Sequence, residues 1–286
     1  MTFKLGFALL THDRPAQAVR LVKRLNAMFD FPPIAWHHDF LRCPELSAEE
    51  LTPNVTLVHP HIETGWRRFS IVEAAIRTIE MLFSARGRPD GFFLLSGSDY
   101  PVKPAERILQ DVSNSPYDAH IAHEAIIYNG FDRPWQRTCY DRYCAIKLPW
   151  WPFNGTGIVR HPLLVGPFLP FTKSFVCYAG EFWFYGNRSA AEYLIAQHRI
   201  RRDLVAHYRT REFSDESYFQ TILCNSSLKI SNYHWRYIDW YPPAGQSTPK
   251  RLGMEDLPRL RRTAAHFARK FEPDTEVLDA LDAEIM

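Results

Sequence analysis

An apolar run that ends abruptly in turn-forming residues and a carboxylate is the feature that most constrains this chain. Residues 92–95 are Phe-Phe-Leu-Leu, and Ser-Gly-Ser-Asp-Tyr-Pro follows at once. This pattern is typical of a buried strand that delivers Asp99 to the carboxyl edge of a parallel sheet, where open α/β sheets bind ligands. A plain turn, in which Asp99 hydrogen-bonds nearby backbone, explains the same residues. The sequence on both sides favours the ligand-binding interpretation.

The flanking sequence alternates short apolar runs with amphipathic segments. This alternation predicts a mostly parallel, doubly wound α/β sheet flanked by helices, in a single large domain that spans residues 1–286. Neither G-x-G-x-x-G nor G-x-x-x-x-G-K occurs, so no motif supports a dinucleotide-binding or P-loop fold. The predicted strands are 5–10, 34–38, 55–58 and 92–95, and the predicted helices are 15–29, 69–83 and 104–112.

The second half of the chain is less regular. Residues 117–172 are rich in aromatic residues, prolines and charges, which predicts long loops. A strand at 182–185 and a helix at 189–196 follow. Ser214 is predicted to cap a helix that runs to Leu223, with two acidic residues in its first turn.

The composition is that of a globular protein without a nucleic-acid surface. Hydrophobic residues make up 46% of the chain, and the net charge is only +2. The five cysteines have no metal-binding spacing, which favours reduced thiols, while a Cys139–Cys144 disulfide stays open. No run approaches the roughly 20 apolar residues of a transmembrane helix, and residues 5–10 lack a signal-peptide cleavage pattern. We therefore expect a cytoplasmic protein.

Several sequence blocks, in a fixed order along the chain, carry a resemblance to a known family. The blocks are Phe7–His12, Trp36–Asp39, Trp66 with Ser70–Ala74, Leu95–Pro101, Gly180–Phe184, Ser214–Leu223 and His266–Phe271. Together they resemble the core-2/I-branching N-acetylglucosaminyltransferases, a family that includes peptide O-xylosyltransferases and bacterial relatives. The membrane anchor and disulfides of the animal members have no counterpart here, which points to a bacterial-type member.

The resemblance implies a GT-A-like fold and an inverting glycosyltransferase. Such an enzyme moves a sugar, N-acetylglucosamine or xylose, from a UDP-sugar to an acceptor hydroxyl without a metal or another cofactor. The segment 96–99 carries one acid, where a divalent metal would require two. We expect residues 1–115 to form the nucleotide-binding half and residues 116–286 the acceptor-binding and catalytic half. The expected partners are a nucleotide sugar and a hydroxyl acceptor, and the oligomeric state is left open.

Two alternatives stay open at this point. One is a metal-dependent GT-A transferase in which Asp99 and a distant acid or histidine bind the ion. The other is a sugar-binding relative that kept the fold and lost turnover.

Sugar transfer requires a base for the attacking hydroxyl and positive charge at the leaving diphosphate. Glu216 matches the family's catalytic glutamate, although a first-turn glutamate can also serve only the helix dipole. Lys270 is the strongest candidate for the diphosphate, and either Arg251 or Lys250 is the second cation. Arg269 is expected to be an exposed neighbour. A solvated basic surface would explain the same four cations.

Donor and acceptor contacts are also implied by the matched positions. Aromatic faces pack on sugar rings and polar groups bind hydroxyls, although each of these side chains could equally serve packing. The implied nucleotide contacts are Asp39, His37, His12, Asp99 and Trp66. The implied acceptor contacts are Glu124, Arg133, Arg137, Trp183 and Tyr185.

Overall fold

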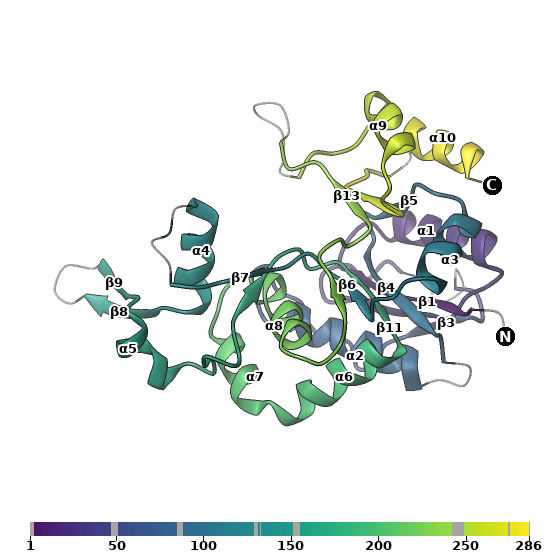
Figure 1. The fold of residues 1–286 in the computed structure, drawn as a ribbon. Coiled ribbons are helices and arrows are strands. Elements are labelled where there is room, and N and C mark those ends of the chain that lie inside the picture. Colours follow the sequence, from purple (N-terminus) through teal and green to yellow (C-terminus); the bar gives the residue numbers. More distant parts are fainter. Residues whose placement is uncertain are drawn as a thin grey trace.

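The computed structural model describes residues 3–46, 51–84, 88–128, 131, 133–150, 155–241, 249–273 and 275–285. A seven-stranded sheet with the order β12-β6-β11-β4-β1-β2-β3 lies at its centre (Figure 1). Its β11 runs antiparallel to both neighbours, and the other pairings are parallel. The strands are β1 (Leu5–Thr11), β2 (Ile34–His38), β3 (Val55–Leu57), β4 (Gly91–Ser96), β6 (Ala119–His120), β11 (Tyr185–Asn187) and β12 (Ile230–Ser231).

Helices cover both faces of this sheet. The helices are α1 (Pro15–Phe29), α2 (Ser70–Ser84), α3 (Ala105–Ser113), α4 (Pro134–Tyr143), α5 (Pro162–Val165), α6 (Arg188–Ile200), α7 (Arg202–Arg209), α8 (Tyr218–Cys224), α9 (Leu257–Arg262) and α10 (Glu276–Glu284). Short 3-10 turns lie at η2 (Gly166–Phe168), η3 (Ser214–Glu216) and η4 (Met254–Asp256).

Smaller sheets complete the fold. A three-stranded sheet joins β5 (Tyr100–Pro101), β14 (Phe267–Arg269) and β13 (Arg236–Ile238). Two antiparallel pairs join β7 (Glu124–Ala125) with β10 (Tyr178–Ala179) and β8 (Ile146–Trp150) with β9 (Gly155–Val159).

The side chains of β1 alternate between two hydrophobic cores, one on each face of the sheet. Phe7 and Leu9 pack in a core that includes residues of α1, α3 and α10. Ala8 and Leu10 pack in the core that includes residues of α2, α6 and α8. Because successive strand residues point to opposite faces, one buried strand supports both helical layers. The predicted doubly wound α/β domain is confirmed, and its central sheet takes strands from both halves of the chain.

Two predictions about the second half are wrong, and the strand predicted at 182–185 lies instead at Tyr185–Asn187. Residues 117–172 are not only loops, because they contain α4, the β8–β9 hairpin and α5. The sequence of α4 is mostly polar, so its buried face does not stand out as a hydrophobic pattern. That face consists of Cys139, Tyr140 and Tyr143. Ser214 does not cap a helix either, because its hydroxyl donates to the carbonyls of Tyr208 and Arg211, and α8 begins only at Tyr218.

The five cysteines are free, so the Cys139–Cys144 disulfide that the sequence left open does not form. Among the helices of the described ranges, none is long and apolar enough to cross a bilayer.

Candidate functional site

The carboxyl ends of β1 and β4 meet the end of β14 at one edge of the sheet. The amide of Phe271 donates to the carbonyl of Ser98 at 3.0 Å. The side chain of Gln17, near the start of α1, donates to the carbonyl of Phe271 at 2.9 Å. These bonds bring Lys270 beside the turn that follows β4, although the two segments are far apart in the sequence. The edge that binds ligands in open α/β sheets is therefore where these sequence blocks converge.

Asp99 lies inside this edge rather than on it. One carboxylate oxygen accepts hydrogen bonds from the amide and the hydroxyl of Ser96, both at 2.6 Å. The other oxygen lies 3.3 Å from the guanidinium of Arg236, and both side chains are fully buried. The turn interpretation therefore explains the contacts of one carboxylate oxygen of Asp99, and the buried Arg236 accounts for the other. A contact with the donor stays a prediction.

Arg236 was missed by the sequence analysis. Its guanidinium donates to the carbonyl of Leu94 at 2.9 Å, so it links the end of β4 to Asp99. Burial lowers the pKa of Arg236 to about 10, which the negative charge of Asp99 opposes. A lone arginine at the start of a short strand, here β13, gives no sequence signal, because its partner Asp99 lies far away in the turn between β4 and β5.

Three basic side chains gather near the end of β14. Glu272 bridges two of them, since its oxygens lie 2.7 Å from Arg14 and 2.8 Å from Arg251. Lys270 is half-buried beside them, and within the described ranges it forms no salt bridge. Burial lowers the pKa of Lys270, and the nearby charge of Arg269 adds to this effect. An anion at this edge would meet Lys270 directly and would compete with Glu272 for Arg14 and Arg251.

Lys250 is separated from this group. Its ammonium lies 2.7 and 2.8 Å from the two carboxylate oxygens of Asp256, and both side chains are buried. Arg251 points to solvent, with a side chain that is 57% exposed. The sequence alone could not choose between the two cations, and the structure leaves Arg251 as the accessible one.

The burial of Lys250 and the exposure of Arg251 predict losses of stability of different size for two matched variants. Lys250→Met leaves Asp256 buried without its partner, so we expect the free energy of unfolding to fall by about 1.5–3 kcal/mol. Arg251→Met removes only an exposed ion pair and should change that free energy by about 0–1 kcal/mol. Urea unfolding followed by circular dichroism measures both. Equal losses in the two variants would contradict the structural role given to Lys250.

The expectation that Arg269 is an exposed neighbour is wrong. Its guanidinium lies 4.6 Å from the centre of the Trp183 ring. Burial lowers the pKa of Arg269, and the negative charges of Asp99, Glu181 and Asp215 oppose this effect. Pairing of β14 with β13, which sets Arg269 opposite Ile238, carries the side chain into the fold. Arg269 thus lies between the Asp99 turn and the acidic residues near Glu216.

Glu216 opens into a cavity of about 680 Å³. The η3 turn presents its side chain, and the guanidinium of Arg142 on α4 donates to it at 3.0 Å. Arg142 in turn lies over the ring of Phe213, 4.0 Å from its centre. The cavity is lined by Ala122, His123, Glu124, Arg133, Trp135, Arg142, Ala179, Gly180, Glu181, Glu216, Asn232, Trp240 and Tyr241.

The electrostatics of this cavity make Glu216 a group that titrates near neutral pH. Desolvation, followed by the negative charge of Asp215, raises the pKa of Glu216 to about 7, and Arg142 opposes the rise. Desolvation also raises the pKa of Asp215 to about 6 and raises that of Glu181. A general base functions best when its pKa lies near the operating pH. Glu216 is therefore suited to accept a proton inside this cavity.

The predicted acceptor residues divide into two groups. Glu124 and Arg133 do line the cavity, and Glu124 accepts hydrogen bonds from Arg133 and from Gln136. Arg137 is exposed on α4 but is not one of the cavity-lining residues.

The two predicted aromatic acceptor residues are buried and are not among the residues that line this cavity, so their contact with an acceptor stays a prediction. Tyr185 is only 1% exposed, because β11 places it inside the central sheet against Phe93 and Trp235. Trp183 is buried, with Arg269 against its ring. The aromatic side chains that do line the cavity are Trp135, Trp240 and Tyr241, which the sequence analysis did not single out.

Two of the predicted nucleotide contacts, Asp39 and His37, are buried and accept hydrogen bonds from the loop that follows β3. Asp39 accepts from the amide and hydroxyl of Thr64, both at 2.7 Å. Burial would raise the pKa of Asp39, but hydrogen bonds from Thr64 and the local backbone hold it below its usual value. His37 accepts from the amide of Ile62 at 2.8 Å, and burial lowers the pKa of His37 to about 4. Their contact with a nucleotide stays a prediction.

His12 and Trp66 are the exposed members of that group. His12 follows β1 directly and lies 4.0 Å from Asp13. Trp66 is 73% exposed, which excludes a place in the core. The guanidinium of Arg67 lies 3.9 Å from the centre of its ring, and Phe213 packs edge-on against it at 5.8 Å. Trp66 therefore lies next to the segment that leads into Glu216.

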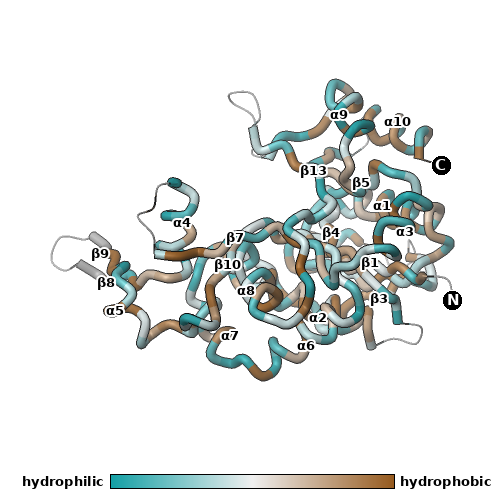
Figure 2. Tube along the Cα trace, in the orientation of Figure 1, coloured by the Kyte–Doolittle hydropathy of each residue, from teal (hydrophilic) through white to brown (hydrophobic). Residues whose placement is uncertain are grey.

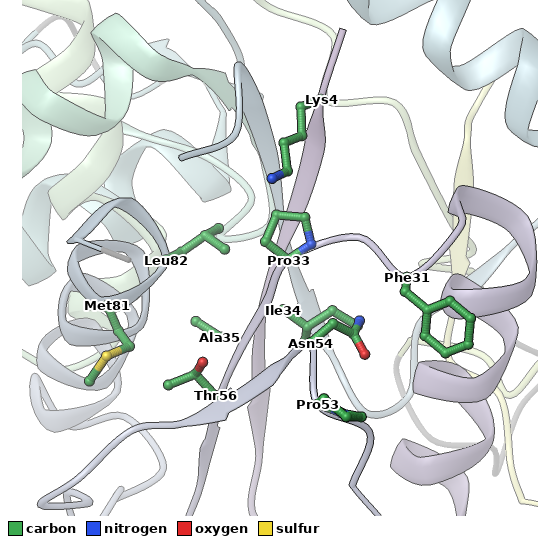
Figure 3. Close-up of a pocket in the computed structure, with 10 residues that line it drawn as sticks. All are labelled: Lys4, Phe31, Pro33, Ile34, Ala35, Pro53, Asn54, Thr56, Met81 and Leu82. Atoms are coloured by element: carbon green, nitrogen blue, oxygen red, sulfur yellow. The ribbon is translucent and has the colours of Figure 1, made fainter. Parts of the chain in front are cut away.

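A second cavity, of about 250 Å³, lies at the opposite edge of the sheet (Figure 3). Lys4, Pro33 and Asn54 mark the amino ends of β1, β2 and β3 around it. Lys4 is the one ionisable side chain among the described residues that line it. Without a carboxylate that could act as a general base among the described residues that line it, this cavity is a poor candidate for catalysis, and the carboxyl edge remains the candidate site.

Known proteins support the resemblance that the sequence blocks carry. The family model "Branch: Core-2/I-Branching enzyme" matches residues 39–261. Beta-glucuronosyltransferase GlcAT14B of Arabidopsis thaliana is 25% identical over 238 residues, covering 82% of this chain and 52% of that protein. GlcAT14C of the same plant is 28% identical over 206 residues, covering 69% and 50%. The chain thus spans about half the length of these curated relatives.

A solved structure of mouse xyloside xylosyltransferase 1, in its apo form, is similar over 92% of this chain and 97% of its own, with a TM-score of 0.39 and 12% identity. The family assignment comes from the sequence match, which extends from the end of β2 to α9 and includes Glu216. On this match, the chain belongs to the core-2/I-branching enzyme family, a family of glycosyltransferases.

Proposed function

We propose that this chain is an inverting glycosyltransferase that moves a sugar from a UDP-sugar to an acceptor hydroxyl, with Glu216 as the general base. One observation carries the proposal. A carboxylate whose pKa is raised to about 7 opens into a cavity with exposed aromatic side chains. Aromatic faces and a few placed polar groups are typical of a site that binds sugars.

The proposed reaction is a single displacement. The acceptor hydroxyl gives its proton to the Glu216 carboxylate while its oxygen attacks the anomeric carbon of the donor sugar. The bond from that carbon to the diphosphate oxygen breaks, and UDP leaves with the electron pair. Attack opposite the leaving group inverts the anomeric configuration. Lys270 and Arg251 are proposed to neutralise the negative charge that builds up on the leaving diphosphate.

The donor sugar is proposed from the family rather than from a contact. N-acetylglucosamine and xylose follow from the resemblance of the sequence blocks. The names of the Arabidopsis relatives add glucuronic acid as a donor to test. Free thiols favour a reducing compartment, so we place the reaction in the cytoplasm of a bacterial-type cell.

A panel of nucleotide sugars tests the proposal. Binding of a ligand raises the melting temperature by mass action, so UDP-sugars of the three candidate donors should each be compared with UDP alone in thermal-shift experiments. Mass spectrometry of sugar and glycan acceptors should then detect a product heavier by one sugar. Donor binding without a product on any hydroxyl acceptor would favour a sugar-binding relative that has lost turnover.

UDP binding is expected to survive removal of divalent metal. Asp99 is already bonded to Ser96 and lies next to Arg236, and within the described ranges no three His, Cys, Asp or Glu side chains are grouped as metal ligands. Basic side chains are proposed to take the role of the ion. Calorimetry with UDP in EDTA should give an affinity close to that in Mn²⁺. Binding that requires Mn²⁺ would instead support the metal-dependent alternative.

A further inference from the structure

The part of the chain farthest from both termini has an outer surface that is apolar and basic. We name it the outer arm and define it as β8, β9, α5 and η2. Figure 1 shows β8, β9 and α5 together at the end of the molecule away from the N- and C-termini. Figure 2 shows hydrophobic residues on β9 within this arm. The arm lies beyond α4, which supplies Arg142 to the Glu216 cavity.

The inner side of the outer arm is fixed to the rest of the protein. The hydroxyl of Tyr140 on α4 donates to the carbonyl of Arg160 at 2.8 Å. The guanidinium of Arg160 donates to Asp141 at 2.5 and 2.8 Å. Ile158 and Leu169 pack against the hydrophobic core beneath the arm. The arm therefore has a defined orientation, with one side held and the other presented to solvent.

Large apolar side chains on the arm are exposed. Leu163 is 82% exposed and Phe168 is 75% exposed, and Leu164 and Leu148 are also open to solvent. Single exposed apolar residues are ordinary on protein surfaces, whereas several on neighbouring short elements mark an interaction site. They lie outside the Glu216 cavity, so substrate binding there does not explain them.

The exposed charges in this part of the chain are positive. The acid that contacts the arm, Asp141, is paired with Arg160. Residues 142–180 contain no Asp or Glu, while Lys147 and Lys173 are exposed within them. The centres of protein–protein interfaces are depleted in lysine. Exposed Leu and Phe with flanking lysine are instead typical of a surface that enters the interface of a membrane and is attracted to anionic lipids.

We propose that the outer arm docks the protein onto the surface of a membrane that contains anionic lipids. Leu163, Phe168 and their apolar neighbours enter the boundary between headgroups and acyl chains. Lys147 and Lys173 remain at the level of the lipid phosphates. Because α4 holds the arm through Asp141 and contributes Arg142 to the cavity, docking keeps the cavity close to the bilayer.

Sedimentation with lipid vesicles tests the proposal without any donor or acceptor, so its outcome is independent of the proposed reaction. The full chain should sediment with vesicles that mix phosphatidylcholine and phosphatidylglycerol, and less with phosphatidylcholine alone. Added NaCl should weaken this binding, because salt screens the attraction between lysine and lipid phosphate. Lys147→Gln combined with Lys173→Gln should remove most of the preference for phosphatidylglycerol.

A matched pair of double variants tests whether the outer arm, rather than exposed apolar side chains in general, binds the vesicles. Leu163→Ser with Phe168→Ser should weaken vesicle binding roughly tenfold or more, since binding scales with the apolar area that enters the membrane. The control is Ile200→Ser with Phe31→Ser, which removes one aliphatic and one aromatic side chain that are exposed elsewhere. The control should bind vesicles as the unchanged protein does.

Three results would overturn the proposal. The first is an unchanged protein that is folded by circular dichroism and does not bind phosphatidylglycerol vesicles. The second is an equal loss of binding in the arm variant and the control. The third is a dimer in light scattering that only the arm variant dissociates, with no vesicle binding, which would mean that a second copy of the chain covers the arm.

Discussion

Glu216→Gln is expected to slow sugar transfer by about 10²–10⁴-fold, the usual loss when a general base is removed. The amide keeps the size of the side chain and a carbonyl oxygen that can accept a hydrogen bond, but it cannot take the proton of the attacking hydroxyl. Binding of UDP should change little, because Glu216 opens into the aromatic-lined cavity and the proposed diphosphate cations lie near the end of β14. Initial rates with a true acceptor, together with calorimetry for UDP, measure both effects.

Two further variants make this result specific to Glu216. Glu212→Gln changes an exposed glutamate in the same segment and should leave the transfer rate unchanged. Asp215→Asn changes the neighbouring acid, whose pKa is also raised. If Asp215→Asn abolishes transfer in a folded protein while Glu216→Gln does not, the base has been assigned to the wrong residue. Donor hydrolysis is not a substitute for this assay, because water can be activated differently from a sugar hydroxyl.

Lys270→Ala is expected to weaken UDP binding and sugar transfer together. Loss of one charge-assisted contact costs about 1.5–3 kcal/mol of binding. Because negative charge grows on the diphosphate as the bond breaks, the transfer rate should fall further, by about 10²–10³-fold. Calorimetry and initial rates at saturating donor separate the two losses.

Lys229→Ala is the matched control, because Lys229 is an exposed lysine next to β12, an edge strand of the seven-stranded sheet, whereas Lys270 follows β14 in the three-stranded sheet. It should leave both quantities unchanged. If Lys270→Ala is folded and retains normal UDP affinity and normal turnover, Lys270 does not contact the diphosphate. A loss in both lysine variants would indicate a general effect of net charge.

The parallel part of the sheet could be predicted because its strands bury both faces. The runs at 5–10 and 92–95 are continuously apolar, and β1 and β4 form there as neighbours. The helix α4 could not be predicted, because its exposed side is polar. Its few buried residues, two tyrosines and a cysteine, do not form a clear hydrophobic pattern. Tertiary packing, rather than local propensity, determines such a helix.

The candidate site likewise contains residues that could be predicted from the sequence and residues that could not. Glu216 and Lys270 could be named because each lies in a contiguous sequence block. The partner that sets the environment of Glu216 could not, because Arg142 reaches Glu216 from another element, α4. Burial also decided between residues that look equivalent in sequence. Lys250 is held by Asp256 while Arg251 is exposed, and Tyr185 lies in the sheet while Tyr241 is 93% exposed at the cavity.

The pH dependence of kcat/KM for sugar transfer, measured for the unchanged protein and for Glu216→Gln, tests the role of Glu216 most directly. Desolvation and the charge of Asp215 raise the pKa of Glu216 to about 7, and only the ionised form can accept a proton. The value for the unchanged protein should therefore rise from acidic pH, reach half of its maximum near pH 7 and level off above it. In Glu216→Gln the remaining activity should lose this rise. A rise near neutral pH that persists unchanged in Glu216→Gln would contradict the assignment of Glu216 as the general base.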